Sequence, residues 1–460
     1  MSHEDRRHAG FKERTRVAVA RERLLARVSP HGRVASVPLG SVDERAVAER
    51  IDAPTPVPGY DRAAMDGYAV RAEDTFGASG RSPALLRVRG READAGNGDG
   101  DGDGDGEEEG GDRHDGADAT DTPTADLRPG EAHRVHTGSE VPAGADAVVK
   151  IEDVEAFGDE LEVFDGVAVG ENVGPTGEDV AEGQTLFEPG HVLRPSDVGL
   201  LKSVGIDRVP VYERPTAGVI PTGEELVQSD PGPGEVIETN GLTVSQLVSR
   251  WGGQPTYRNV VTDDRDALRA AIQRDLTKDV VVTTGGSSVG ERDLVPEVVD
   301  DLGEVLVHGV ALKPGHPVAL GVVEGTPVLM LPGYPVACIV NAVQFLRPAL
   351  KRAGGMAVPD LPTVRARLDG KVRSEPGTRT FARVELSGTE GDDDPGAGSD
   401  APDGTDVDDE IDRVATPTRT SGSGVLSSVA LTDGWVVVPE PLEGYDAGAV
   451  VDVELWEYSG

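Results

Sequence analysis

The sequence is poor in cysteine and in long apolar runs. Cys338 is the only cysteine among 460 residues, which excludes an internal disulfide and a zinc site built on cysteines. It lies in PVACIVNAV, so we expect a buried, small apolar side chain. No apolar run approaches the roughly 20 residues needed to span a bilayer, and the opening MSHEDRRHAG lacks the hydrophobic segment of a signal peptide. We therefore expect a cytoplasmic protein.

Lysine is also scarce, and arginine supplies most of the positive charge. The chain has 83 acidic and 44 basic side chains, which gives a formal net charge of −39. Such a surface repels nucleic acids and anionic membranes. Excess carboxylate with little lysine is typical of a halophilic acidic protein, because a salty cytoplasm screens the self-repulsion. An acidic protein from an ordinary cytoplasm is the alternative interpretation.

Two acidic stretches contain almost no apolar side chains. Residues 92–126 repeat Asp, Glu and Gly, and residues 391–409 have a similar composition. Neither stretch can bury enough apolar surface to offset its ordering entropy, so we expect solvated insertions, the first of them disordered and dispensable. The first stretch imitates a calcium-binding EF-hand loop. However, its first ligand position is Asn97 and no helix flanks it, which favours a plain insertion.

The remaining sequence is long enough for roughly two to four domains. Helical spacing of apolar residues predicts a helix over residues 12–28, and DERAVAERI, residues 43–51, is a second helix candidate. Short β-branched runs in residues 61–172 predict a small β domain that contains the first insertion. A helical pattern and then a strand follow in residues 195–212.

From residue 215 to about residue 355, strand and helix patterns alternate with short loops. We expect strands in TAGVIPTG, around YRNVV, in VVVTT and near VLVHGVAL, with helices between them. A hairpin in VALGVVEGTPVLMLPG and a closing helix from YPVACIV complete the pattern. This alternation predicts a parallel sheet with helices on both faces. Residues 361–460 are strand-like throughout and predict a separate C-terminal β domain.

The loops after these predicted strands carry the residues suited to chemistry. Gly285-Gly286-Ser287-Ser288 precedes a helix candidate, and consecutive amides in such a loop can bind an anion. Its spacing fits neither G-x-G-x-x-G nor the P-loop, so a tight structural turn is the alternative. Glu225, Asp263 and Asp293 follow three strands whose carboxyl ends should share one edge. Each acid alone could be a helix cap, but together with the glycine-rich loop they predict a site that holds a cation beside an anion.

Seven motifs occur in the order found in one protein family. They are AAMDGYAVRAED, HTGSEVPAGADAVVKIED, GEDVAEG, GVIPTGEEL, VVTTGGSSVGERD, LKPGHP and LPGYPV. On these motifs the sequence resembles the molybdopterin molybdenumtransferase family, which includes the E domain of gephyrin. The resemblance implies a multidomain α/β plus β protein. Its implied parts are an elongated linker domain (1–60 and 173–214), an inserted β domain (61–172), a molybdenum-cofactor-type three-layer α/β domain that binds molybdopterin (215–355) and a C-terminal β-barrel-like domain (361–460).

The resemblance also implies a reaction and its residues. Enzymes of this family insert molybdate or tungstate into adenylylated molybdopterin and release AMP, with dependence on Mg²⁺. The matching motifs place active-site residues at Asp66, Thr137, Asp179, Glu225, Asp263 and Asp293. The glycine-rich loop, Lys313, Pro332 and Pro335 would line the pterin and phosphate pocket, and Asp293 and Glu225 are the acids expected to hold Mg²⁺. A homodimer is implied, in which Asp66, Thr137 and Asp179 reach the site of the other subunit.

Two other functions share parts of this pattern. A molybdopterin adenylyltransferase, which is also a candidate partner, has the α/β domain without the flanking AAMDGYAV and HTGSEVPAG motifs. A non-catalytic scaffold would not need the matched acids. The sequence departs from the family at Gly174 and Pro175, at His316, where Lys is common, and at Tyr334, where Asn is common. These departures bear on oxyanion binding and on the preference between molybdenum and tungsten.

The net charge generates a test of salt adaptation. Carboxylate repulsion acts over roughly 30 Å at 0.01 M salt but over about 3 Å at 1 M. We therefore expect the thermal unfolding midpoint of the chain to rise strongly with salt concentration. Calorimetry across this range measures the effect, and a flat profile would count against a salt-adapted surface.

Overall fold

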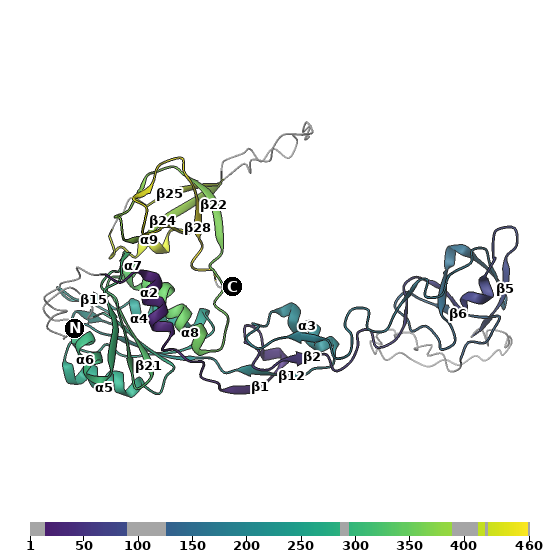
Figure 1. The fold of residues 1–460 in the computed structure, drawn as a ribbon, viewed down its shortest axis with the longest axis horizontal. Coiled ribbons are helices and arrows are strands. Elements are labelled where there is room, and N and C mark those ends of the chain that lie inside the picture. The colour runs from purple at the N-terminus through teal and green to yellow at the C-terminus, as the bar shows by residue number, and fades with distance from the viewer. Residues whose placement is uncertain (1–13, 90–125, 286–293, 389–412, 419–421, 459–460) are drawn as a thin grey trace, which may run out of the picture. The chain divides into compact units, whose positions relative to one another are not determined.

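The computed structural model describes residues 14–89, 126–285, 294–388, 413–418 and 422–458 (Figure 1). Residues 92–125 and 391–409 of the predicted insertions lie outside this part of the chain. The chain divides into two compact units, which are described separately. One comprises Met1–Glu49, Glu188–Pro195 and Arg208–Gly460, and the other Arg50–Phe187 and Ser196–Asp207. No helix among the described residues is long and apolar enough to cross a membrane.

A six-stranded sheet forms the centre of the first unit, in the order β16-β13-β17-β21-β20-β18. Its strands are β13 (Thr216–Pro221), β16 (Gln254–Tyr257), β17 (Val280–Thr284), β18 (Glu304–His308), β20 (Ala319–Val323) and β21 (Thr326–Leu331). The first four strands in this order are parallel, as predicted. The sheet as a whole is mixed, because β20 pairs antiparallel with β18 and β21. Glu324 and Gly325, with φ values of 50° and 87°, close the predicted β20–β21 hairpin.

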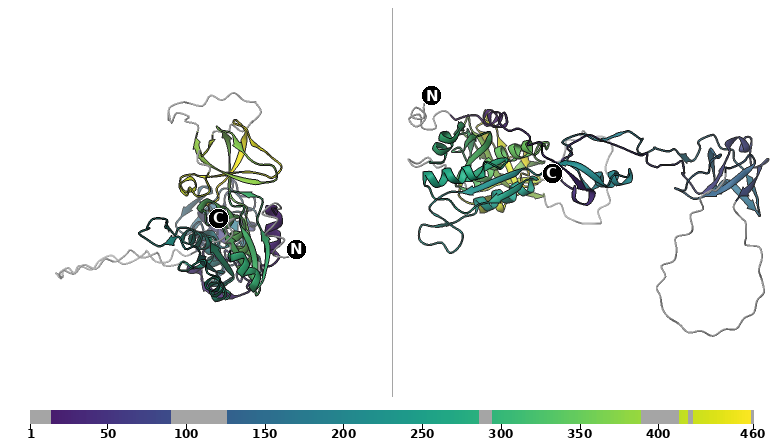
Figure 2. Two further views of the ribbon diagram at one scale, coloured as in Figure 1. Left: turned by 90° about the vertical axis from the view of Figure 1, so that its left-hand side faces the viewer. Right: turned by 90° about the horizontal axis from the view of Figure 1, so that it is seen from below.

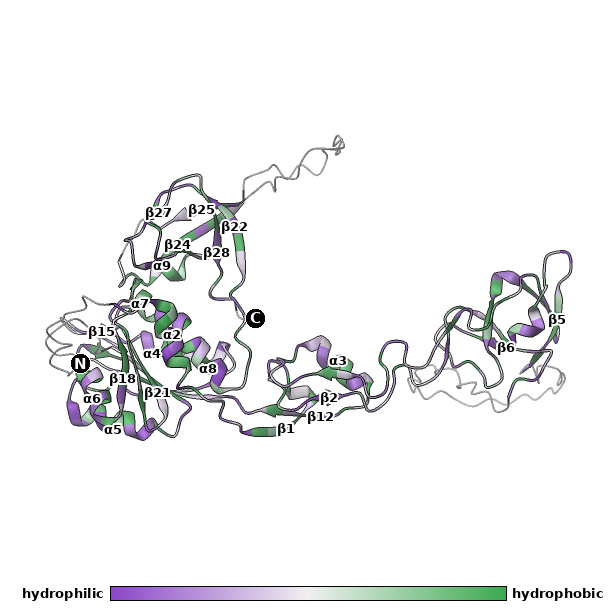
Figure 3. Cartoon of the chain, in the orientation of Figure 1, coloured by the Kyte–Doolittle hydropathy of each residue, from purple (hydrophilic) through white to green (hydrophobic). Residues whose placement is uncertain are grey.

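Helices cover both faces of this sheet and make three layers. Alternate side chains of β13, β17 and β21 point to opposite faces, as strand geometry requires. One face packs against α2 (Val17–Leu25), α4 (Asn240–Arg250), α7 (Pro335–Asn341) and α8 (Arg347–Ala353). The other face packs against α5 (Arg265–Asp275) and α6 (Leu294–Leu302). Figure 3 shows hydrophobic residues along β21 and hydrophilic ones on the outer sides of α5 and α6.

The predicted closing helix contains an irregular turn. Between α7 and α8, Ala342–Leu346 forms a π-helical segment. Pro348 has no N–H to donate to the carbonyl of Gln344 four residues earlier, so regular α-helical bonding is interrupted there. The carbonyl of Gln344 instead accepts a hydrogen bond from Nε of Arg21 on α2 at 3.2 Å.

The C-terminal strands of this unit close into a barrel, seen from two further sides in Figure 2. They are β22 (Thr363–Leu368), β24 (Arg379–Gly388), β25 (Arg413–Pro417), β26 (Gly434–Val438) and β28 (Val450–Glu454). The ring runs β24-β25-β22-β28-β26 and closes because β26 also pairs with β24. Closure leaves no unpaired edge within the ring. The short strand β19 (Leu312–Lys313) runs parallel to the start of β24.

The second unit contains the predicted small β domain. Its sheet has the order β7-β4-β6-β5-β9-β8. The strands are β4 (Gly67–Val70), β5 (Ala84–Arg89), β6 (Glu131–Val135), β7 (Ala147–Lys150), β8 (Val154–Phe157) and β9 (Glu160–Val163). Two short antiparallel strand pairs are formed by the residues that precede and follow this sheet in the chain. They are β2 (Ile51–Asp52) with β11 (Thr185–Phe187), and β3 (Arg62–Ala63) with β10 (Val173–Gly174).

Around the points where the chain passes between the two units, one prediction is confirmed and another is wrong. The helix and strand expected in residues 195–212 are α3 (Pro195–Ser203) and β12 (Arg208–Tyr212), which pairs with β1 (Val34–Pro38).

Residues 43–51 are not the helix predicted for them. The N–H of Val47 donates to His191 and its carbonyl accepts from Gly190, so the backbone bonds to distant segments instead of to itself. A nine-residue helix is too short to persist without packing, and these contacts outweigh its propensity.

The tight pairing of β4 with β7 makes Gly67 a test of this fold. A Cβ atom at Gly67 would lie 1.9 Å from the carbonyl oxygen of Val149. We expect Gly67→Ala to destabilise the second unit by about 1–3 kcal/mol, the usual cost of overpacking. The matched control is Gly80→Ala, because no atom lies within 4 Å of that position. Equal denaturation midpoints for the two variants would contradict the β4–β7 register.

Candidate functional site

The first loop of the predicted site follows β13. Gly223 has a φ of 145°, which favours glycine, and a Cβ there would lie 2.8 Å from Oε2 of Glu225. The carboxylate of Glu225 therefore lies against this turn. The N–H of Gly223 donates to the carbonyl of Val261 at 3.2 Å, and the N–H of Val261 donates to Pro221 at 2.9 Å. These bonds join the loop after β13 to the segment that contains Asp263.

Two consecutive aspartates follow Val261, and the structure gives them different roles. Asp264 is the N-cap of α5, since its Oδ1 accepts from the N–H of Ala267 at 2.9 Å. Asp263 is half-buried. Burial, and after it the charges of Glu225 and Glu224, raise the pKa of the Asp263 carboxyl. The helix-cap alternative thus holds for Asp264, while Asp263 belongs with the acids of the first loop.

The backbone at the end of β17 comes very close to the end of β13. Gly285 has a φ of 134°, and a Cβ there would lie 2.1 Å from the carbonyl oxygen of Thr222. The N–H of Gly285 donates to the carbonyl of Leu331 at the end of β21, at 3.1 Å. The first glycine of the predicted anion loop is therefore required by close packing of three strand ends.

Three buried hydroxyls lie at the same strand ends. Oγ1 of Thr222, Thr283 and Thr284 is buried and has no hydrogen-bond partner among the described residues. A buried hydroxyl without a partner costs about 1–3 kcal/mol, so such groups are rarely left unsatisfied. These threonines can donate to an anionic ligand bound at this edge.

The loop after β21 completes the edge. Pro332 is buried, Pro335 begins α7, and Tyr334 between them is 61% exposed. Asn240, the first residue of α4, donates its side-chain N–H to the carbonyl of Gly333 at 2.6 Å. The start of α4 therefore holds this loop in place.

Glu238 is a site-supporting residue that sequence reasoning missed. Its side chain is buried, and Oε1 accepts from the N–H of Gly241 at 2.6 Å. Its Oε2 accepts from the hydroxyl of Tyr257 at the end of β16, and burial followed by this hydrogen bond raises the pKa of Tyr257. Glu238 thereby positions the start of α4 and with it Asn240. The clue in the sequence was an acid three residues before Gly241 at a helix start, which is a capping arrangement.

Lys313 lies on a separate turn of the first unit. It is exposed, and its Nζ is 3.5 Å from Oε1 of Glu375, with both side chains more than half exposed. Gly315 accepts a hydrogen bond from the side chain of Asn341, and a Cβ on Gly315 would lie 3.1 Å from the carbonyl oxygen of Ala337. The turn after Lys313 therefore packs against α7, the helix that Pro335 begins.

The second unit brings Asp66 and Thr137 together. Asp66 directly precedes β4, as the predicted strand-entry turn requires, and is exposed. Its Oδ1 accepts from the N–H of Thr137 at 2.7 Å and from the Thr137 hydroxyl at 2.9 Å. The backbone bond, followed by the hydroxyl bond, lowers the pKa of the Asp66 carboxyl. This pair therefore presents a fixed, ionised carboxylate on the surface.

Asp179 lies in a different loop of the same unit. Its side chain is exposed, and its N–H donates to the carbonyl of Val57 at 3.0 Å. The neighbouring Thr176 is held by Asp61, whose Oδ1 accepts from the Thr176 N–H at 2.7 Å and hydroxyl at 2.8 Å. A backbone bond from Val141 to Asp61 links this loop to the segment after Thr137.

The predicted site residues thus fall into separate groups. Glu225, Asp263, Gly285, Pro332 and Pro335 share one sheet edge of the first unit, while Asp66, Thr137 and Asp179 belong to the second unit. Gly286, Ser287, Ser288 and Asp293 lie outside the described residues.

The described acids do not form a complete metal cage. No group of three or more His, Cys, Asp or Glu among the described residues is arranged to hold a metal ion. Burial and the neighbouring charges of Glu225 and Glu224, which raise the pKa of Asp263, nevertheless make a cation favourable there. Mg²⁺ is commonly held by one or two carboxylates together with substrate phosphates, and Glu225 fits that kind of site.

Comparison with known families gives three matches along the chain. The model of the MoeA N-terminal region (domain I and II) matches residues 15–205, and the model described as "Probable molybdopterin binding domain" matches residues 218–352. The model of the MoeA C-terminal region (domain IV) matches residues 406–456. The three matches together cover both described units.

Individual relatives match over nearly the full length. A protein of Methanocaldococcus jannaschii named for molybdopterin biosynthesis is 33% identical over 445 residues, which cover 94% of this chain and 95% of the relative. The molybdopterin molybdenumtransferase of Bacillus subtilis is 31% identical, over 89% of this chain and 87% of its own. The crystal structure of a molybdopterin biosynthesis MoeA protein from Pyrococcus horikoshii is 32% identical, covers 97% of this chain and 100% of its own, and superposes with a TM-score of 0.74.

The raised pKa of Asp263 predicts a cost to stability at neutral pH. Below about pH 3.9, the ordinary aspartate pKa, the carboxyl is protonated in the folded and unfolded states and has no effect. As the pH rises from there to the folded-state pKa, the unfolded chain ionises before the folded one, so stability falls, and the full cost is present above the folded-state pKa. We therefore expect Asp263→Asn to raise the unfolding midpoint at pH 7, with the gain shrinking as the pH falls toward about 4.

The adjacent aspartate provides a matched control for this prediction. Asp264→Ala removes the cap of α5 and should cost about 1 kcal/mol at pH 7. Thermal unfolding of both variants across pH separates a repelled carboxylate from a capping one. An Asp263→Asn variant less stable than the wild type at pH 7 would show that Asp263 is structural.

Proposed function

The chain belongs to the MoeA family, and on that premise we propose that it is a molybdopterin molybdenumtransferase, an enzyme of molybdenum cofactor biosynthesis. The observation that carries the proposal is the position of Glu225 and Asp263 at the ligand-binding edge of the domain that matches the molybdopterin-binding model. In finer detail, the enzyme inserts molybdate or tungstate into adenylylated molybdopterin and releases AMP. A cytoplasmic location is part of this proposal.

Charge is the main obstacle to such a reaction, because molybdate and the pyrophosphate are both anions. Backbone amides of the glycine-rich loop, the free hydroxyls of Thr283 and Thr284, and Lys313 can offset their charge. Glu225 and Asp293 would hold Mg²⁺, which when bound neutralises phosphate charge. Oxygen leaving molybdenum as water needs protons and positioning but no protein nucleophile. Asp263, with its raised pKa, is the acid suited to keep such a proton.

The second group of residues supports a shared site in a homodimer. Asp66 and Thr137 form a preorganised, ionised pair on a unit that folds around its own core. We propose that this pair, with Asp179, completes the site of a second copy of the chain. A test is subunit complementation, in which a mixture of Asp66→Ala and Glu225→Ala chains regains activity that neither variant has alone.

The alternative functions fit less of the chain. An adenylyltransferase needs only the α/β domain, whereas the MoeA terminal-region models match on both sides of it. A non-catalytic scaffold does not account for free hydroxyls and repelling carboxylates at one sheet edge. An assay with molybdate and adenylylated molybdopterin distinguishes these functions directly. The exposed Tyr334 and the half-buried His316, whose pKa is lowered mainly by burial, are positions to vary when molybdate and tungstate are compared.

Asp293 provides the sharpest test of the catalytic assignment. It directly precedes α6, so its alternative role is a helix cap. Asn caps a helix about as well as Asp but lacks the charge that Mg²⁺ favours. We expect Asp293→Asn to keep stability within about 0.5 kcal/mol and to retain pterin binding, yet to lose most metal insertion. Asp264→Asn, the same change at the cap of α5, is the control and should retain activity. Wild-type insertion by Asp293→Asn at saturating Mg²⁺ would leave Asp293 as a cap only.

A further inference from the structure

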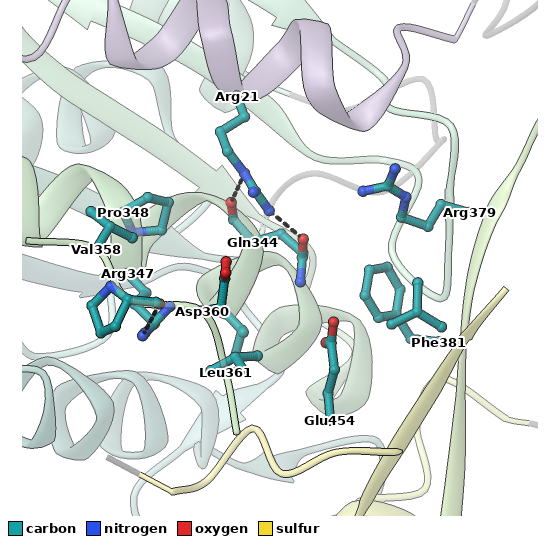
Figure 4. A pocket seen from close by; sticks show the side chains of 13 residues that line it. Arg21, Gln344, Arg347, Pro348, Val358, Asp360, Leu361, Arg379, Phe381 and Glu454 are labelled. Atoms are coloured by element: carbon teal, nitrogen blue, oxygen red, sulfur yellow. Dashed lines mark hydrogen bonds between the residues drawn. The ribbon is translucent and has the colours of Figure 1, made fainter. Parts of the chain in front are cut away.

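A pocket of about 220 Å³ lies within the first unit, and its lining residues do not include those of the proposed active site, although β24 in its wall pairs with β19, which contains Lys313. Its walls come from α2, the π-helical segment after α7, residues 358–361 and the C-terminal barrel (Figure 4). Three arginines from different elements line it, namely Arg21 on α2, Arg347 at the start of α8 and Arg379 at the start of β24. Phe381 and Val437 add an apolar wall from the barrel.

Among the described residues, the hydrogen-bond partners of two of these arginines are neutral. Arg21 donates to the carbonyl of Gln344 at 3.2 Å and to its Oε1 at 2.6 Å. Arg347 is 92% buried as a residue, since its exposed fraction is 8%, and it donates to the carbonyl of Pro359 at 2.7 Å. Burial, followed by the charge of Arg379, lowers the pKa of Arg21, and burial followed by Arg21 lowers that of Arg347. Desolvated positive charges that repel one another are costly without a counter-anion.

The charges of Asp360 and Glu454 raise the pKa values of Arg21 and Arg347 and so partly oppose the effect of burial. Asp360 and Glu454 line the same space, but among the described residues neither lies within 4.0 Å of an arginine nitrogen. Glu454 instead accepts a hydrogen bond from the indole N–H of Trp435 at 2.8 Å. Arg379 pairs with Glu440 at 3.1 Å, and in Figure 4 its guanidinium points into the pocket toward Arg21.

We propose that this pocket binds a small anion that carries a phosphate or carboxylate group. The planar guanidinium groups of Arg21 and Arg379 would donate to its oxygens, and Phe381 would pack against its remaining atoms. The bound anion would join α2 and the interrupted helix to the barrel, which makes this a site for a small-molecule effector rather than for the substrate.

The test measures anion binding to the full chain at constant ionic strength. Inorganic phosphate and malonate are titrated separately against a chloride background, with calorimetry and the thermal unfolding midpoint as readouts. We expect saturable binding and a rise in midpoint with at least one probe, and competition between the probes identifies the preferred group. Arg21→Gln and Arg379→Gln should each weaken binding about tenfold or more, the effect of losing one charge-assisted bond. Arg23→Gln, an exposed arginine on the same helix, is the control and should bind as the wild type does.

Three outcomes would overturn the proposal. They are the absence of saturable binding of either probe, wild-type affinity in both pocket variants, and equal weakening by Arg23→Gln. Far-ultraviolet circular dichroism checks the fold of each variant. If Arg21→Gln alone fails to fold because its bonds to Gln344 are lost, Arg379→Gln decides the question.

Discussion

Close approach of three strand ends is the constraint on which the proposed site depends. Gly285 lies so near the carbonyl of Thr222 that no side chain fits, and it also bonds to Leu331. This contact gathers the loops after β13, β17 and β21 at one edge of the sheet. At the same strand ends the hydroxyls of Thr222, Thr283 and Thr284 are buried and have no hydrogen-bond partner within the described parts of the chain. The packing of the strand ends therefore determines the shape of this edge and also leaves hydroxyl donors there that a ligand could satisfy.

A second layer of contacts keeps the acids at this edge free for chemistry. Glu238 bonds to Gly241 and Tyr257, Asn240 holds the loop at Gly333, and Asp264 caps α5. These residues make the hydrogen bonds that hold the loops and cap the helix. Among the described residues, the carboxylates of Glu225 and Asp263 do not have this role. The cost is burial together with repulsion by Glu225 and Glu224, and both raise the pKa of Asp263. A site for polyanionic ligands can tolerate that repulsion if a cation binds between the acids and the phosphates.

Strand periodicity and strand-end loops are local patterns, so they predicted the parallel core and a separate C-terminal β domain, whereas the barrel was implied only by the family resemblance. Sequence reasoning failed where distant contacts decide the structure. Residues 43–51 have helical composition, yet they form a turn followed by isolated β-bridges, and Val47 bonds to Gly190 and His191. Asp263 and Asp264 could not be told apart, since only the bond to Ala267 shows which one is the cap. Glu238 was missed because its burial depends on Tyr257, nineteen residues away in the chain.

Anion binding in this chain must be local, because its net charge of −39 repels anions at long range. The chain can meet this requirement with buried hydrogen-bond donors, because salt screens buried groups much less than exposed ones. At the sheet edge the donors among the described residues are buried hydroxyls, which bring no net charge. In the pocket beside the π-helical segment they are guanidinium groups. One residue accounts for the position of Arg21 in this pocket. Pro348 leaves the carbonyl of Gln344 without its α-helical donor, and this carbonyl accepts a hydrogen bond from the buried guanidinium of Arg21. A helix irregularity thus places a positive charge where the surface of the protein would otherwise exclude an anion.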